Sequence, residues 1–289
     1  GDTSRDFALG TVPFAQVPRN VNPASGFLVN ANNTPFQAAG AGSELKPGDY
    51  SPLLGIETDT TNRGTRAVEL MGAHPSISAD DLRRIKYDRG ISRLSWAARW
   101  YGDIARVDPR GDAQLVQAQA LLKRWNWDFD GHHSGQALAA ILLRTGQKWH
   151  YPRRPELDPR DALAKAAGYL QRHFGTLDPP LGTVLRLRHG AVDLPLDGGP
   201  DVLRAASTWD EADDGRLVVK HGDSFIMFMT WDKAGRVSSE SVQPYGAATT
   251  RPRSPHYADQ APLFVAHKTK PVLFWRDDLR TSVERVYRP

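Results

Sequence analysis

The sequence contains no cysteine, and its 289 residues include only three methionines. The lack of cysteine excludes disulfide bonds, thiolate metal sites and cysteine nucleophiles. No uncharged apolar run approaches the roughly 20 residues that a membrane-spanning helix requires. The chain begins at Gly1 instead of Met and carries no recognisable signal peptide. We therefore expect that it was cut from a longer polypeptide, by processing or by deliberate truncation.

The sequence also lacks a concentrated patch of charge. Its formal net charge is +4 with a pI near 9.3, but lysine and arginine are dispersed among aspartate and glutamate along the whole length. It has no helix-turn-helix, zinc-finger or RNA-binding signature. We therefore expect neither a nucleic acid nor a membrane as a partner. The length is sufficient for one large domain or two ordinary ones.

Asparagine is concentrated near the N-terminus, in residues 19–35. The segment holds five asparagines, and four of them are Asn22, Asn30, Asn32 and Asn33. They surround the apolar run 27–29, with proline and glycine on either side, which predicts a turn, a buried strand and a second turn. Asparagine is a poor strand residue, so these amides need hydrogen-bond partners or a function. Two interpretations remain open: an amide donor in an oxyanion hole, or a cluster of Asx-turns.

The motif Asn-Pro-x-x-Gly-Phe-Leu-x-Asn-x-Asn-Asn-x-Pro occupies residues 22–35. It resembles the oxyanion-asparagine segment of the penicillin acylase family, the N-terminal-nucleophile amidohydrolases that include acyl-homoserine-lactone and aculeacin acylases. The resemblance implies that Asn32 donates its amide N–H to the oxyanion. It also implies that Asn30 and Asn33 support the side-chain conformation of Asn32.

A second block, Gln243–Gly246 followed by Ser254–Gln260, resembles the family pattern Gly-x-Ser-x-x-Pro-x-Ser-x-His-Tyr-x-Asp-Gln. The block departs from that pattern where Ala247 and Thr249 replace common serines. Taken alone, a histidine and an aspartate three residues apart suggest a general base with its orienting carboxylate, or two metal ligands. The resemblance implies a buried structural latch instead. Its members are His256, Tyr257, Asp259 and Gln260.

Arg63 is the third position that the resemblance identifies. The family places an arginine at the start of a helix near the active site, where its guanidinium can hold the oxyanion asparagine and favour substrate carboxylates or carbonyls. Arg66, one helical turn further on, is the alternative, although its position is more typical of a surface ion pair. For either residue, a solvated helix-surface charge is the simplest interpretation.

The periodicity predicts a helical middle of the chain and strands near its C-terminal end. A capping box at Ser78–Asp81 predicts a helix start. Further helices are predicted at 63–71, 95–104, 113–125, 134–143, 159–174 and 277–286. Strands are predicted at 217–219 and 272–275, with a hairpin formed by 224–231 and 237–241 around a turn at 233–235. Val12–Phe14 is expected to extend a sheet edge.

This order of elements favours an α+β fold in which both ends of the chain contribute strands to one sheet. The resemblance implies part of a four-layer αββα N-terminal-nucleophile hydrolase sandwich. We expect residues 1–75 to form the core segment with the oxyanion asparagine, 76–178 a helical segment, and 179–289 the returning strands with a C-terminal helix.

The resemblance also implies an activity, the hydrolysis of acyl-homoserine lactones, penicillin-type side chains or related N-acyl amides. In this family a terminal serine attacks, with its own α-amine as base. Such a residue is expected upstream, so the chain should be the C-terminal part of the large (beta) chain and inactive alone. Its expected partners are the rest of the same precursor and a small N-acyl substrate. The alternative is a non-catalytic relative or binding module that lacks the nucleophile.

The remaining site expectations are of lower specificity. Apolar residues near the asparagine segment can line a substrate pocket or the core: Phe14, Phe27, Phe36, Leu53 and Leu54.

We expect no cofactor, although some relatives hold a structural calcium to which Asp49 or Asp59 could contribute. His132 and His133 follow an acidic turn but match a family loop better than a metal site. Relatives are exported, so a periplasmic or secreted location is expected. Another interpretation is a carbohydrate-binding domain with exposed tryptophans at 96, 100, 125 and 127.

Overall fold

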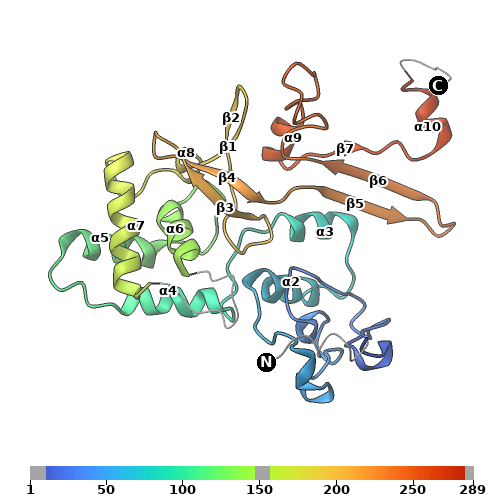
Figure 1. The fold of residues 1–289 in the computed structure, drawn as a ribbon, viewed down its shortest axis with the longest axis horizontal. Coiled ribbons are helices and arrows are strands. Elements are labelled where there is room, and N and C mark those ends of the chain that lie inside the picture. The colour runs from blue at the N-terminus through green and yellow to red at the C-terminus, as the bar shows by residue number, and fades with distance from the viewer. Residues whose placement is uncertain (1–10, 147–156, 284–289) are drawn as a thin grey trace.

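The computed structural model describes residues 11–146 and 157–283, and it divides them into an irregular N-terminal part, a helical part and a strand-rich part. The colours of Figure 1 follow this order along the chain, with the N-terminal part beneath the helices α2 and α3 and the strands above them. None of the helices in these ranges is long and apolar enough to cross a membrane.

The N-terminal part has little regular structure. It contains four short 3₁₀ turns: η2 (Phe14–Gln16), η3 (Pro35–Gln37), η4 (Pro47–Asp49) and η5 (Pro52–Leu54). The predicted buried strand at 27–29 is wrong, because Leu28 makes only an isolated bridge to Ala39 and is half exposed. The predicted sheet extension at 12–14 is also wrong, because Phe14 starts an exposed 3₁₀ turn. Prolines, which cannot donate to a strand ladder, begin three of the four turns.

The predicted helices are confirmed where local signals are strong. Ser78 and Asp81 form the expected capping box, and helix α7 begins at Pro159 and ends at Phe174, as the sequence predicts. The helices are α2 (Asn62–Gly72), α3 (Ala79–Lys86), α4 (Trp96–Arg106), α5 (Ala113–Arg124), α6 (Gln136–Gly146), α7 (Pro159–Phe174), α8 (Leu181–Val184), α9 (Ala261–Val265) and α10 (Arg276–Arg280). The predicted last helix is therefore shorter, and its residues 284–286 lie outside the described ranges.

Two small sheets follow the helices. The first has the order β2-β1-β4-β3, with β1 parallel to β4, and the second has the order β5-β6-β7. Their strands are β1 (Leu185–His189), β2 (Val192–Pro195), β3 (Ala206–Glu211), β4 (Leu217–Gly222), β5 (Ile226–Trp231), β6 (Val237–Val242) and β7 (Lys270–Pro271). The predicted hairpin is confirmed as β5–β6. The strand predicted at 272–275 is wrong, because β7 ends at Pro271.

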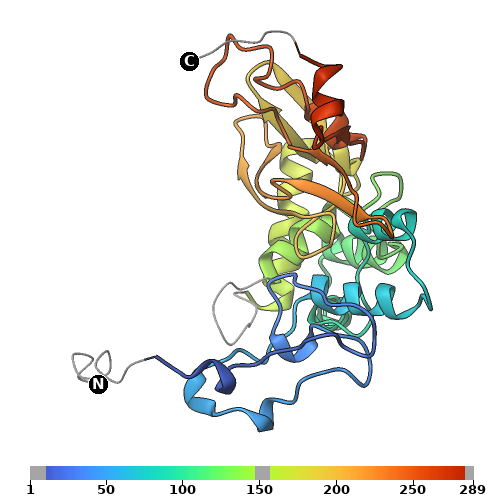
Figure 2. The ribbon, with the colours of Figure 1, turned by 90° about the vertical axis from the view of Figure 1, so that its right-hand side faces the viewer.

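The α+β class is confirmed, but the described sheets draw their strands from the C-terminal part of the chain only. Figure 2, turned by 90° from Figure 1, again shows the N-terminal part on the far side of the helices from the strands. The expectation that both ends build one sheet is therefore wrong for the described residues. The N-terminal part instead packs on α2, as the candidate site shows.

Helices α4 to α7 and the inner face of the first sheet share one hydrophobic core. Trp100 and Trp125 belong to this core, each with 3% of its surface exposed. Tyr101 packs edge-on against the Trp125 ring at 4.9 Å between centroids and donates its hydroxyl to the carbonyl of Ala139. A carbohydrate-binding surface built on four exposed tryptophans is therefore excluded, because two of the four are buried.

Candidate active site

The first turn of helix α2 anchors the site. Thr61 caps the helix, and its hydroxyl accepts a hydrogen bond from Gly64 N at 2.9 Å. The carboxylate of Asp201 lies at the same end and accepts from Asn62 N at 2.8 Å. An anion at a helix N-terminus is stabilised by the unpaired N–H groups and by the helix dipole. The start of α2 is thus tied to a residue far along the sequence.

Asp201 is fully buried and has more than one partner. Its Oδ2 also accepts from the indole Nε1 of Trp96 at 2.8 Å, and its backbone carbonyl accepts from the Asn62 side chain at 2.7 Å. Its Oδ1 accepts from Arg63 Nε at 3.3 Å. A buried carboxylate is tolerated when its oxygens are satisfied in this way. Asp201 therefore fixes both the helix start and the guanidinium of Arg63.

Asn32 lies at the tip of a tight turn that its neighbours hold. Its backbone N–H donates to Asn30 Oδ1 at 3.0 Å, and Ala31 N donates to Asn33 Oδ1 at 2.6 Å. The Asn33 amide also donates to the carbonyl of Gln37 at 2.9 Å. Asn32 itself has a φ of 55°, in the left-handed region that asparagine tolerates better than most residues. Asn30 and Asn33 thus fix the backbone of the turn from which the Asn32 side chain extends.

The turn lies directly on helix α2. A Cβ built on Gly64 would come within 2.7 Å of Asn33 Cβ, so only glycine permits this approach. The hydroxyl of Thr61 also lies 3.5 Å from the carbonyl of Ala31. The glycine at position 64 therefore allows the asparagine turn to lie against the first turn of α2.

Arg63 joins the two parts of the site. Its Nη2 donates to Asn32 Oδ1 at 3.1 Å, while its Nε faces Asp201. Because a guanidinium only donates, the asparagine must present its oxygen to Arg63. The Nδ2 end of the carboxamide then points away from the arginine, and among the described residues it donates to no acceptor. Asn32 is exposed, so this N–H is available to a group that approaches from outside.

Arg66 does not contact Asn32. It makes two hydrogen bonds to the carboxylate of Asp88, both at 3.0 Å, and lies 3.8 Å from Glu69. The hydrogen bond with Asp88 is the main reason that its pKa lies above the ordinary value for arginine. Of the two arginines that the sequence leaves as candidates, the structure places Arg63 beside the asparagine and Arg66 in an ion pair.

The predicted substrate-binding residues do not form one pocket. Phe36 lines a cavity of about 470 Å³ together with Tyr50, and the two rings lie 5.9 Å apart. Phe27 instead packs on the backbone of Gly40, where a Cβ would come within 2.8 Å of its ring. Leu53 is 95% exposed and Leu54 is half-buried in the turn η5. Of this set, Phe36 lines this cavity, and it lies close to Asn32 in the sequence.

The His-Tyr-x-Asp-Gln block is only partly buried. His256 and Asp259 are exposed and contact each other, with Nδ1 of the histidine 2.9 Å from the carboxylate. Gln260 is buried, and its side-chain oxygen accepts from Gln243 N at 3.0 Å. Tyr257 packs its ring against His189, at 4.2 Å between centroids. The expected buried latch is thus wrong for His256 and Asp259, and the buried anchor is Gln260.

The acidic side chain in the turn before α6 forms hydrogen bonds with neighbouring residues of this chain. Asp130 contacts the ring of His133 and accepts from the Gln136 amide at 2.6 Å, while His132 is exposed. In the part of the chain that the structure describes, no group of three or more histidine, aspartate or glutamate side chains is arranged to hold a metal ion. Asp49 is exposed in turn η4.

Asp201 is the site residue that the sequence analysis missed. It follows Gly198-Gly199-Pro200, which marks only a turn, and it lies 138 residues beyond Arg63. The sequence signal at this point was a turn, because glycine, proline and aspartate are all typical turn residues. Nothing in the sequence, however, shows which helix that charge faces.

Comparisons with known proteins define the class of fold. The chain is similar to the solved structure of a thermostable penicillin G acylase from Alcaligenes faecalis, with a TM-score of 0.52 over 97% of this chain, at 15% sequence identity. That likeness identifies an N-terminal-nucleophile hydrolase fold. The chain spans only 60% of the length of the solved chain.

The family follows from the sequence itself. A model of the family described as penicillin amidase matches residues 1–281, which is nearly the whole chain. The chain therefore belongs to the penicillin amidase family.

Proposed function

We propose that this chain is the part of an N-acyl amide hydrolase that supplies an oxyanion donor. The observation that carries the proposal is the set of contacts among Asn32, Arg63 and Asp201. The arginine orients the carboxamide so that its N–H end is free. A free N–H on a fixed side chain is what an oxyanion hole requires.

In the proposed reaction, a serine at the start of a processed chain attacks the carbonyl carbon of an N-acyl amide. Its proton passes to its own α-amine. The carbonyl oxygen becomes an oxyanion and accepts a hydrogen bond from Asn32 Nδ2. The C–N bond then breaks, the protonated amine leaves, and water hydrolyses the acyl-serine ester. This chain contributes the electrostatic step, and the attacking serine belongs to the upstream part of the same precursor.

The proposed substrates are acyl-homoserine lactones, penicillin-type side chains or related N-acyl amides. The cavity beside Phe36 and Tyr50 is apolar enough to accept an uncharged group of such a substrate. Arg63 retains 18% of its side-chain surface exposed beside Asn32, so it can also attract a carboxylate or carbonyl of the substrate. We also propose that the parent protein acts in the periplasm or outside the cell.

The test is an assay of the protein that includes the upstream coding region, beside this chain alone. Long-chain homoserine lactones and penicillins serve as substrates, and release of the free amine is the readout. We expect turnover from the longer protein and none from this chain. Turnover by the chain alone would contradict the assignment of the nucleophile to the upstream region. A folded longer protein with no turnover on any N-acyl amide would favour the alternative, a non-catalytic relative.

A further inference from the structure

Trp96 is the first residue of helix α4, and its indole N–H reaches the carboxylate that holds Arg63. Its Nε1 donates to Asp201 Oδ2 at 2.8 Å. The ring is half-buried and packs against the hydrophobic core that α4 to α7 share with the first sheet. A buried aromatic ring has only two side-chain torsions, and packing fixes both. The N–H is therefore presented to Asp201 from a constant position.

The two oxygens of the Asp201 carboxylate have different partners. Oδ2 accepts from Asn62 N and from Trp96 Nε1, each at 2.8 Å, so donors from two helices hold it. Oδ1 faces Arg63 Nε at 3.3 Å. The terminal torsion of an aspartate has a broad energy profile, so hydrogen bonds decide the plane of the carboxylate. Loss of the indole N–H would remove one of these two donors to Oδ2 and allow the plane to turn.

The plane of this carboxylate determines where the Arg63 guanidinium lies. One edge of the guanidinium faces Asp201, and Nη2 at the other edge donates to Asn32 Oδ1 at 3.1 Å. The guanidinium is planar and rigid, so a movement at one edge displaces the other. A turn of the carboxylate is therefore passed on to the exposed carboxamide of Asn32.

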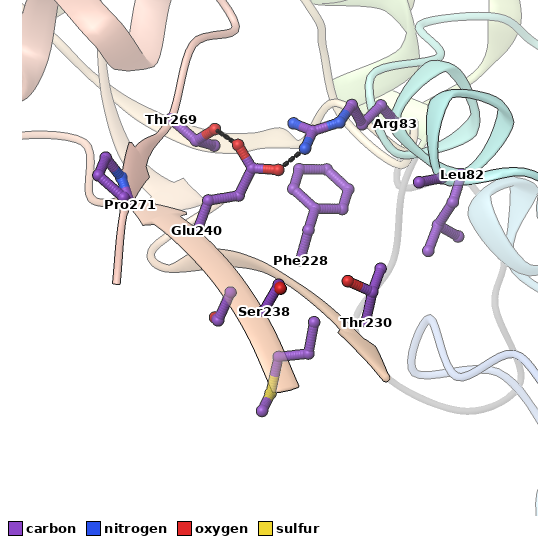
Figure 3. A pocket seen from close by; sticks show the side chains of 11 residues that line it. Leu82, Arg83, Phe228, Thr230, Ser238, Glu240, Thr269 and Pro271 are labelled. Atoms are coloured by element: carbon purple, nitrogen blue, oxygen red, sulfur yellow. Dashed lines mark hydrogen bonds and ion pairs between the residues drawn. The ribbon is translucent and has the colours of Figure 1, made fainter. Parts of the chain in front are cut away.

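Arg83 offers a matched comparison outside the candidate site. Figure 3 shows its ion pair with Glu240, whose carboxylate also accepts from the Thr269 hydroxyl. A neutral donor, a carboxylate and an arginine thus follow one another here as they do at Trp96. The Arg83 guanidinium, however, lies over the Phe228 ring, 4.8 Å from its centroid, and not beside an exposed amide. Thr269 is therefore the counterpart of Trp96 in an arrangement that does not orient Asn32.

We infer that Trp96 is a positioning residue for the oxyanion donor Asn32. Its indole N–H fixes the plane of the Asp201 carboxylate, and that carboxylate fixes the guanidinium that holds the amide. Trp96 itself touches neither the substrate nor Asn32 and acts only through these contacts. The inference rests on the proposed function for its kinetic readout, whereas its structural readout is independent of turnover.

The kinetic test uses the longer protein that includes the upstream region. Trp96→Phe should lower kcat about fivefold or more with KM within about twofold of wild type, because a displaced positioning group slows the chemical step. A second variant carries benzothienylalanine at position 96, in which sulfur replaces the indole N–H and the ring keeps its shape. We expect the same fall in kcat. A kcat within about twofold of wild type for the benzothienylalanine variant would overturn the inference.

Two controls separate positioning from a general loss of stability. Trp100 lies one turn further along α4 and donates its Nε1 to the carbonyl of Leu142, also at 2.8 Å, from a more buried position. Trp100→Phe and Thr269→Val should each leave kcat of the folded protein within about twofold of wild type. A fall in kcat for Trp100→Phe as large as that for Trp96→Phe would contradict the inference.

A double-mutant cycle tests the route through Arg63. In the Arg63→Lys background, Trp96→Phe should change kcat by less than about twofold, because the connection to Asn32 is already broken. A merely structural contribution of Trp96 would give the same fall in both backgrounds. That result would overturn the inference.

Crystal structures of the longer protein, as wild type and as Trp96→Phe, give the readout that needs no turnover. In the variant, the distance from Arg63 Nη2 to Asn32 Oδ1 should exceed about 3.5 Å, beyond a hydrogen bond, or the guanidinium should occupy more than one position. An unchanged contact would refute the positioning role at any level of activity. A lost contact in a protein whose wild type hydrolyses no N-acyl amide would refute the proposed function and leave the positioning role standing.

Discussion

The guanidinium of Arg63 donates to the side-chain oxygen of Asn32 from Nη2, at 3.1 Å, while its Nε lies 3.3 Å from the buried carboxylate of Asp201. One planar side chain thus connects an exposed amide to a buried anion. The carboxamide orientation follows from this contact, because the arginine can only donate. Substitutions at Arg63, Asp201, Gly64 and Asn32 test this connection, with activity measured on the longer protein proposed above.

Arg63→Lys should lower kcat about tenfold or more with little change in the free energy of unfolding. A lysine has one ammonium group and cannot face Asn32 and Asp201 with the geometry of a fork. Small displacements of a positioning group have effects of this size on rate. The matched control is Arg66→Lys, one helical turn away and paired with Asp88, for which we expect kcat within about twofold of wild type. Equal effects of the two substitutions on kcat would refute the special role of Arg63.

Asp201→Asn should destabilise the fold by about 3 kcal/mol, because it leaves Arg63 without its anion and removes a buried acceptor from α2. Urea unfolding followed by tryptophan fluorescence measures the change. Asp193→Asn is the control, since Asp193 pairs with Arg186 at the surface and should cost less than about 1 kcal/mol. The folded fraction of Asp201→Asn should also show a kcat lowered about tenfold. A stability loss with unchanged kcat would make Asp201 structural only.

Gly64→Ala should destabilise the protein by about 1–3 kcal/mol and lower turnover, because the new methyl group would push on Asn33. Gly72→Ala in the same helix meets nothing within 4 Å and should be neutral or slightly stabilising. Thermal unfolding measures the stability of the two variants, and a turnover assay on each compares their activity. A neutral Gly64→Ala would show that the asparagine turn does not lie on α2 as described.

The ion network around Asp197 predicts a pH dependence of stability. Burial alone would raise the pKa of this carboxyl, but the hydrogen bond from His267 and the charge of Arg204 lower it below its usual value. The folded chain therefore holds fewer protons at this group than the unfolded chain. The stabilisation is fully present above the unfolded pKa of about 4 and is lost as the pH falls from there toward the folded pKa.

Asp197→Asn should consequently cost about 3 kcal/mol at pH 7. Its deficit relative to wild type should shrink steadily below about pH 4. Urea unfolding at a series of pH values measures both. Asp103→Asn, which removes an exposed helix-surface pair with Arg106, should cost under about 1 kcal/mol at pH 7. A deficit for Asp197→Asn that stays constant down to pH 2.5 would contradict the lowered pKa.

Local signals account for the parts of the fold that the sequence predicted well. The capping box at Ser78, the N-cap Asp158 with Pro159 as the first residue of α7, and the glycine turn of the β5–β6 hairpin each act over a few residues. Strand β1 was not predicted, although its sequence Leu-Arg-Leu-Arg-His alternates apolar and polar residues and its burial follows the same alternation. This period of two is the signal of a half-buried strand, but here it extends over only five residues.

The candidate site shows the same division. The motif around Asn32 and the position of Arg63 were recognisable in sequence, and the structure brings the two side chains together. The carboxylate of Asp201, which anchors these two side chains, was not recognisable in the sequence, because Asp201 reaches α2 only through the tertiary fold. The N-terminal apolar run was assigned to a buried strand, yet the turns that surround it leave Leu28 without a ladder.

The kinetic effect of removing the Asn32 side chain tests the central claim most directly. Asn32→Gly suits this purpose, because glycine adopts the φ of 55° without strain and the substitution removes the whole side chain with its carboxamide. Measured on the proposed longer protein with an N-acyl amide, kcat/KM should fall about 10²- to 10³-fold while the unfolding midpoint stays near that of wild type. A kcat/KM within about threefold of wild type would contradict the assignment of Asn32 as the oxyanion donor.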